Sequence, residues 1–185
     1  MADPTQPAPR LEPKPKESWD DDTRALIGTN PINIFATLAH HPKLMKRWMV
    51  FGNHVLAKST LSARDRELLI LRTGWNCRSP YEWGQHVAIA RAIGVTDEEV
   101  ERVAAGPDTP GWDPFEALLL RAADELHSDS SLSDATFAAL AQRYDEQQLL
   151  DLVFTVGQYH LVSMALNSMR VQRDDGVTGV PIPER

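Results

Sequence analysis

The stretch that decides the fold is residues 62–94, SARDRELLILRTGWNCRSPYEWGQHVAIARAIG. Within it the uninterrupted apolar run 68–71, Leu-Leu-Ile-Leu, lies between Glu67 and Arg72. A helix that is apolar on nearly every face lies inside a domain or between subunits. The pattern therefore predicts a buried helix over 63–75 that carries two ionisable side chains.

The rest of the chain is also predicted to be helical, because apolar residues recur at spacings of three and four between Pro and Gly residues. Ser62 is the expected N-cap of the buried helix, and Thr96 with Glu99 forms a capping box. The predicted helices span residues 31–40, 42–57, 63–75, 81–93, 97–105, 114–127, 132–143 and 145–170. No strand pattern stands out, so we expect an all-α domain of about eight helices.

The length of 185 residues, with 42% hydrophobic residues, suits one domain with terminal extensions. Five of the 13 prolines fall in the first 15 residues, which predicts an extended arm over 1–18. The arm is either disordered or laid across a neighbouring subunit, with Leu11 and Trp19 as anchors. The domain is expected over 19–175, followed by a tail over 176–185.

Composition excludes several classes of function. The net charge of −7 gives no general electrostatic footprint for nucleic acid or for an anionic membrane, so neither partner is expected. The single cysteine, Cys77, excludes an intramolecular disulfide and a CxxC centre within one chain. No GxSxG elbow or glycine-rich phosphate loop is present. The N-terminus does not resemble a secretory signal, and a cytoplasmic protein is expected.

A second nearly all-apolar helix is expected over 149–169. A bundle of this size surrounds one such helix more easily than two. We therefore expect a homo-oligomer.

The two ionisable residues beside the apolar run each need a partner, because a buried charge is costly unless it is paired. Glu67 and Arg72 are five residues apart, which places them about 140° apart around a helix. Direct pairing between them is therefore poor, and each is expected to pair elsewhere or to serve a site.

On the next helix Glu82 and His86 are four residues apart and share a face, as do Tyr81 and Gln85. A carboxylate beside an imidazole raises the pKa of the histidine and orients it, which is typical of a general acid or base. The alternative is a solvated polar pair without a catalytic role. A metal would need a third ligand from a distant part of the chain, so no metal is expected.

The second half of the chain also carries polar groups on apolar helices. Asp124 and His127 are three residues apart, and Gln158, His160 and Asn167 interrupt the long apolar helix. Polar groups on a buried helix must be hydrogen-bonded, either within the fold or at a pocket. We expect His160 to be the pocket residue of this half.

Four segments together resemble the carboxymuconolactone decarboxylase family of the AhpD-like superfamily, over roughly residues 30–175. They are RELLILRTG (66–74), YEWGQHVAIARAIGV (81–95), LLLRAADELH (118–127) and LVFTVGQYHLVSMALNS (152–168). The resemblance implies an all-helical AhpD-like fold around a buried helical pair, assembled into a homo-oligomer that is a dimer, a trimer or a hexamer. It also implies one of two chemistries, because the superfamily contains both peroxidases and decarboxylases.

In the AhpD-type peroxidases a CxxC pair precedes the relay histidine and an upstream glutamate completes the relay. Counting back from His86 places the two thiol positions at Ser79 and Glu82, and the relay glutamate at Glu67. Cys77 occupies neither thiol position. Peroxidase or peroxiredoxin-like activity is therefore disfavoured, because the resolving thiol is missing.

The other implied chemistry is the decarboxylation of γ-carboxymuconolactone in aromatic-compound catabolism, by a lyase without a cofactor. On this interpretation His86 delivers the proton, while Glu82 and Glu67 tune it. Arg72 binds the anionic substrate, and Tyr81 donates to its carbonyl.

The leading hypothesis is thus an acid/base enzyme without a cofactor, acting on a small anionic or lactone-like substrate. The chain is longer than typical members that decarboxylate the lactone, which leaves the substrate open. The remaining hypothesis is a non-catalytic helical oligomer or small-molecule binder, in which the Glu–His pair is only an ion-pair network.

Overall fold

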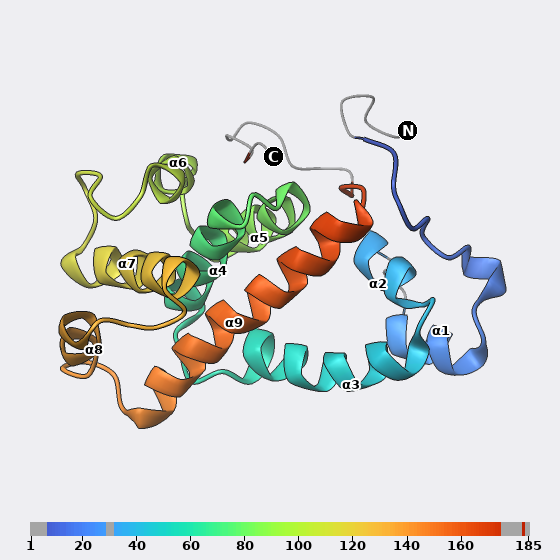
Figure 1. The fold of residues 1–185 in the computed structure, drawn as a ribbon, viewed down its shortest axis with the longest axis horizontal. Coiled ribbons are helices and arrows are strands. Elements are labelled where there is room, and N and C mark those ends of the chain that lie inside the picture. Colours follow the sequence, from blue (N-terminus) through green and yellow to red (C-terminus); the bar gives the residue numbers. More distant parts are fainter. Residues whose placement is uncertain (1–6, 29–31, 175–182, 184–185) are drawn as a thin grey trace.

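A computed structural model describes residues 7–28, 32–174 and 183 of the chain, and its regular elements in these ranges are helices (Figure 1). The α-helices are α1 (Asp21–Ile27), α2 (Asn33–Leu38), α3 (Pro42–Asn53), α4 (Ala63–Asn76), α5 (Pro80–Ala92), α6 (Asp97–Ala105), α7 (Pro114–Ser128), α8 (Asp134–Leu140) and α9 (Glu146–Met169). A 3₁₀ turn, η1 (Lys16–Ser18), precedes α1, and a π-helical turn, η2 (His54–Lys58), follows α3. The all-α prediction is confirmed.

The local signals in the sequence start the helices where they were expected. The Ser62 side chain accepts a hydrogen bond from the backbone N–H of Asp65 and so begins α4. Thr96 and Glu99 form the capping box of α6. These side chains satisfy N–H groups that the first turn of a helix leaves unpaired.

One helix was missed by the sequence analysis, so the described residues contain nine α-helices rather than about eight. The missed helix is α1, whose first turn is capped by Asp20 through the backbone N–H of Thr23. It ends at Gly28, whose φ of 68° lies in the region that glycine adopts without strain. Its buried residues Thr23 and Ile27 anchor it to the rest of the N-terminal region.

The four residues of the apolar run on α4 are all fully buried, because helices surround α4 on every side. Leu69 packs with α7 and α9, while Leu68 and Leu71 pack with α5 and α6. Ile70 packs with Val55 and Tyr159. The expectation of a buried helix is confirmed, and α4 is the central element of the domain.

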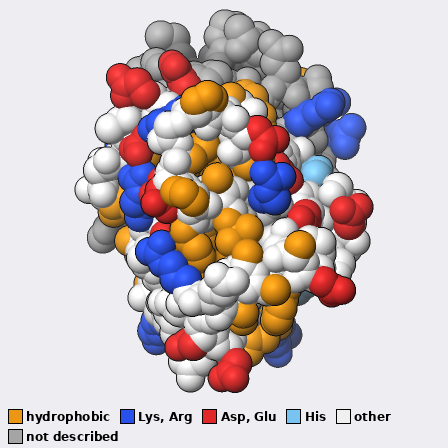
Figure 2. All heavy atoms as spheres, turned by 90° about the vertical axis from the view of Figure 1, so that its left-hand side faces the viewer, with side chains coloured by type: hydrophobic (Ala, Val, Ile, Leu, Met, Phe, Trp, Pro, Cys, Tyr) orange, Lys and Arg blue, Asp and Glu red, His pale blue; other side chains and the backbone are white. Residues whose placement is uncertain are grey.

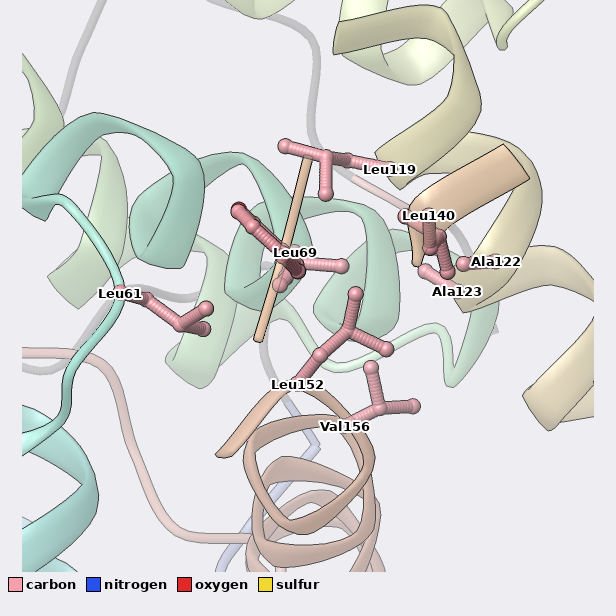
Figure 3. Packing of buried hydrophobic residues seen from close by; sticks show 9 residues of the cluster. Leu61, Leu69, Leu119, Ala122, Ala123, Leu140, Leu152 and Val156 are labelled. Carbon is pink, nitrogen blue, oxygen red and sulfur yellow. The ribbon is translucent and has the colours of Figure 1, made fainter. Parts of the chain in front are cut away.

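The cluster around Leu69 shows how this burial is achieved. In Figure 3 Leu69 lies between Leu119 of α7 and Leu152 of α9. The other buried members are Leu61, Ala122, Ala123, Leu140, Tyr144 and Val156. Ala122 and Ala123 of α7 lie beside Leu140 of α8, so the cluster also joins α8 to the core (Figure 3).

Helix α9 crosses the molecule between α3 and the pair formed by α4 and α5 (Figure 1). Its length and mean hydropathy of 1.4 over 18 residues would suit a membrane span. However, Leu152, Val156 and Leu166 of α9 are buried in the protein core. One face of the helix therefore belongs to the core of the helical domain.

The N-terminal arm, from residue 7 onward, lies on its own chain. The backbone N–H groups of Arg10 and Leu11 donate to the carbonyl of Met169 at the end of α9. Trp19 is buried together with Ile27 and Met45. Residues 1–6 of the predicted arm, and all of the predicted tail except Pro183, lie outside the described residues.

The face that carries α6, α7 and α8 has acidic and basic side chains interspersed around apolar ones (Figure 2). Salt bridges account for part of this mixture, such as those from Arg64 to Glu99 and Glu116. A face of mixed charge lacks the continuous basic stripe that backbone phosphates require.

Shortening the side chain at the centre of this packing should destabilise the domain. We expect Leu69→Ala to lower the free energy of unfolding by about 2–5 kcal/mol, because it leaves a cavity between three helices. Leu44→Ala on α3 is the matched control, since Leu44 is half-exposed, and it should cost less than about 1 kcal/mol. Urea unfolding of both variants measures the difference, and equal losses would contradict the central place of α4.

Candidate functional site

The site is built on the hairpin of α4 and α5. Cys77 ends α4, and Arg78 adopts a left-handed conformation with a φ of 48°. Pro80 then opens α5, which returns along α4. The short turn brings Glu67, on α4, opposite His86, on α5.

Both ring nitrogens of His86 contact carboxylates. Nδ1 lies 2.7 Å from Oε2 of Glu67, and Nε2 lies 3.0 Å from Oε1 of Glu82. Glu67 is fully buried, and the other two side chains are about 95% buried. With both carboxyl groups ionised, both ring nitrogens donate, which describes an imidazolium held between two anions.

The electrostatics agree with this charge state. Burial by itself lowers the pKa of His86, whereas the hydrogen bonds to Glu67 and Glu82 raise it, and the net pKa is about 9. His86 is thus charged at neutral pH. The alternative interpretation of Glu82 and His86 as a solvated pair is not supported, because both side chains are buried.

Arg66 and Tyr159 also contact this cluster. Arg66 Nε lies 3.2 Å from Oε1 of Glu67, so two cations face two anions. The ring of Tyr159 lies edge-on to the imidazole, with 4.8 Å between ring centroids. Burial and the two carboxylates raise the pKa of Tyr159 well above its usual value, so its hydroxyl stays protonated.

Beside this cluster lies a cavity of about 150 Å³ between α2, α3, α5 and α9. Glu82, His86 and Tyr159 line it, whereas Glu67 does not. Its other lining residues are Ile32, Ile34, Phe35, Trp48, Met49, Gly52, Asn53, Leu56, Tyr81, Gln85, Ile89, Gln158 and Val162. None of these described lining residues is Lys or Arg, so the cavity is apolar with one polar wall.

Tyr81 lies at the rim of this cavity, but its hydroxyl is already engaged. It donates to Asp174 at 2.5 Å and accepts from the backbone N–H of Ile34 at 3.1 Å. Gln85 also donates to Asp174. Asp174 thus attaches the segment after α9 to the cavity, a role that the sequence analysis missed.

Two predicted substrate-binding residues lie elsewhere. Arg72 pairs with Asp124 of α7, at 2.6 and 3.0 Å, and also donates to the carbonyls of Val103 and Ala104 at the end of α6. It therefore ties three helices together. Both Glu67 and Arg72 have found separate partners, as their spacing predicted.

His160 also does not line the cavity, although its chain neighbour Tyr159 does. Its Nε2 lies 2.7 Å from Nδ1 of His127 of α7. His160 therefore points away from the face of α9 that lines the cavity. The structure thus brings together Glu67, Glu82, His86 and Tyr81, and separates Arg72 and His160 from them. Tyr159, which packs against His86, is one of the cavity residues that the sequence analysis missed.

The raised pKa of His86 predicts a pH dependence of stability. A histidine whose pKa rises from 6.5 to about 9 on folding stabilises the protein fully below pH 6.5. That contribution is lost as the pH rises through about 9, and it amounts to about 3 kcal/mol at most. Urea unfolding across this range should show a decline in wild type that His86→Gln reduces; identical pH profiles would contradict the assignment.

Comparison with solved structures places the fold. A peroxidase-related protein from Ralstonia eutropha, described as an AhpD core, is 20% identical over 92% of this chain and 95% of its own, with a TM-score of 0.82. A peroxidase-related protein from Silicibacter is 14% identical, over 95% of each chain, with a TM-score of 0.74. Identities this low show the fold alone, and this fold is AhpD-like.

A third similar structure is the debrominase Bmp8, solved in complex with 2,3,4-tribromopyrrole. It is 14% identical over 92% of this chain and 94% of its own, with a TM-score of 0.75. A search of curated protein sequences gave no match.

The sequence of the central segment is similar to that of a known family. Residues 42–125 match the model of the carboxymuconolactone decarboxylase family. This segment runs from the start of α3 into α7 and contains Glu67, Glu82 and His86. Over this segment, which is 84 of the 185 residues, the chain is similar to the carboxymuconolactone decarboxylase family, and its fold is AhpD-like.

Proposed function

We propose that this protein is an acid/base enzyme without a cofactor, which transfers a proton at carbon in a small lactone-like substrate. The observation that carries the proposal is the His86 imidazolium, held between two carboxylates at the wall of a cavity of about 150 Å³. A positioned acid beside a small apolar cavity is what protonation of a carbanion or dienolate requires.

In the proposed step Glu82 exchanges the proton with the substrate. The proton on Nε2 of His86 moves to Glu82, which leaves a neutral imidazole and a neutral carboxylic acid. Glu82 then donates the proton to the substrate carbon and becomes a carboxylate again. His86 then regains a proton from solvent water. The reverse sequence starts from the neutral imidazole: Glu82 abstracts a proton from carbon and passes it to Nε2 of His86.

Glu67 is a positioning residue in this proposal, since it does not line the cavity. Its hydrogen bond fixes the ring of His86 and stabilises the charged form. Arg66 in turn balances the second oxygen of Glu67. The cluster as a whole is close to neutral, which lowers the free-energy cost of burying its charges.

The cavity favours a neutral substrate over an anionic one. Its described lining contains Glu82 but no Lys or Arg, and the predicted anion-binding residue, Arg72, is held by Asp124. A lactone ring, with an apolar body and a carbonyl, matches such a cavity better than a free carboxylate does. We therefore propose a neutral lactone-like substrate rather than an anionic one.

Thiol chemistry has less support. The Cys77 thiol faces His127 at 3.9 Å and does not line the cavity. Burial raises the pKa of this thiol to about 11, so little thiolate is present at neutral pH. We therefore do not extend the peroxidase-related and debrominase descriptions of the similar structures to this chain.

The proposal is tested by proton exchange at carbon, which needs no knowledge of the complete reaction. Small unsaturated lactones, both neutral and carboxylated, are incubated with the protein in D₂O, and NMR follows deuterium incorporation. We expect wild type to catalyse exchange in a neutral lactone, and Glu82→Gln and His86→Gln to lower the rate about 100-fold or more.

Cys77→Ser is the control for this assay and should exchange at the wild-type rate. Exchange that is equal in wild type and His86→Gln would contradict the acid/base proposal. Binding of lactones without exchange would identify the protein as a small-molecule binder instead.

We also propose that α9 pairs with a second copy of this chain. One face of α9 exposes large apolar side chains at helical spacing, namely Leu150, Val153, Phe154, Leu161 and Met164. Phe51 of α3 extends this face by packing edge-on against Phe154. A continuous apolar face on a helix is typical of a subunit interface.

A charge on this face should separate the subunits. We expect Phe154→Glu to convert the oligomer to a monomer, because it buries a carboxylate at the interface. Phe137→Glu on α8 is the matched control, since Phe137 is similarly exposed but lies outside the face. Light scattering during size-exclusion chromatography measures both; a monomeric wild type, or an oligomeric Phe154→Glu, would refute the pairing.

A further inference from the structure

A second cluster of chemically active side chains lies apart from the His86 site. Cys77 at the end of α4, His127 of α7 and His160 of α9 present one donor atom each, and these atoms lie within 4.8 Å of one another. Nδ1 of His127 is 2.7 Å from Nε2 of His160 and 3.9 Å from Sγ of Cys77. None of the three residues lines the cavity beside His86.

The scaffold around this cluster is well fixed. Asn167 donates to the carbonyl of Cys77 at 2.9 Å, which attaches the end of α4 to α9. Asp124, one turn before His127, is held by Arg72 and by Asn76 at 2.7 Å. The three donor atoms therefore converge from three helices that are tied to one another.

The convergence is of the kind that a metal ion produces. In a tetrahedral zinc site, bonds of about 2.0 Å to nitrogen and about 2.3 Å to sulfur separate two nitrogens by about 3.3 Å and nitrogen from sulfur by about 3.5 Å. The observed 2.7 and 3.9 Å lie on either side of these separations. Small rotations of the side chains would bring all three atoms to one centre.

The donor set selects among metals. One thiolate and two imidazoles suit a borderline-soft ion such as Zn²⁺, whereas Mg²⁺ and Ca²⁺ require oxygen ligands. All three side chains are partly exposed, so an ion can enter and a fourth position stays open to water. Catalytic zinc sites with two cysteines, one histidine and one open position use the same ligand types, and one cysteine with two histidines also binds copper in blue-copper proteins.

We propose that Cys77, His127 and His160 form a zinc site with three protein ligands and one open coordination position. Binding releases the thiol proton to solvent. One proton lies in the hydrogen bond between Nδ1 of His127 and Nε2 of His160. When the metal binds, this proton moves to solvent or to the other nitrogen of the same ring. The site is independent of the proposed acid/base function.

The test uses the full chain, freed of metal with a chelator and then titrated with Zn²⁺ or Co²⁺. We expect one Zn²⁺ per chain by calorimetry. Co²⁺ should produce the visible bands of a tetrahedral site together with a thiolate-to-metal charge-transfer band in the near ultraviolet.

Variants assign the ligands. Cys77→Ser should abolish the charge-transfer band, and His127→Asn and His160→Asn should each weaken Zn²⁺ binding about 100-fold or more, beyond what loss of an outer-shell partner causes. His54→Asn is the matched control, because His54 is half-exposed and contacts Asp151 instead. His86→Gln should also bind Zn²⁺ normally, which separates this proposal from the acid/base function.

The proposal is overturned if wild type binds no Zn²⁺, or if the three ligand variants bind it as wild type does. It is also overturned if His54→Asn weakens binding as much as they do. Circular dichroism of each metal-free variant verifies folding, and the two histidine variants keep the test decisive if Cys77→Ser does not fold.

Discussion

The structure depends on one buried carboxylate. Glu67 lies on α4, the helix that other helices surround on every side, and its side chain is fully buried. A charge in that position is costly unless a cation meets it with good hydrogen-bond geometry. His86 of α5 and Arg66 provide the two cationic partners, and Glu82 then holds the other nitrogen of His86. The polar wall of the cavity follows from this arrangement.

The packing around α4 makes the arrangement rigid. Three apolar clusters surround α4, and the pair of Arg72 and Asp124 ties α4 to α7 while Arg72 also closes the end of α6. Tyr159 of α9 packs against the imidazole from a third direction. A donor held by several helices keeps its geometry while a proton moves, which is what acid/base catalysis requires. The same ties to α4, α7 and α9 support the second cluster at Cys77.

Much of the fold was predictable because its signals are local. The apolar run 68–71 and the capping box at Thr96 specify their helices directly, and the spacing of Glu82 and His86 predicted their contact. The missed helix, α1, also had local signals in the Asp20 cap and in Gly28, but its proximity to the proline-rich arm masked them.

The contacts that could not be predicted join distant segments. His160 was expected at the pocket, but adjacent residues on a helix point about 100° apart, so Tyr159 faces the cavity and His160 faces His127. The pairing of Arg72 with Asp124 was also missed, because spacing along the chain does not show which helices become neighbours.

The measurement that tests the central claim most directly is ¹⁵N NMR of the His86 imidazole in the wild-type protein. The account predicts that both ring nitrogens are protonated at neutral pH and that the ring titrates near pH 9. A neutral ring at pH 7, with one bare nitrogen, would contradict it.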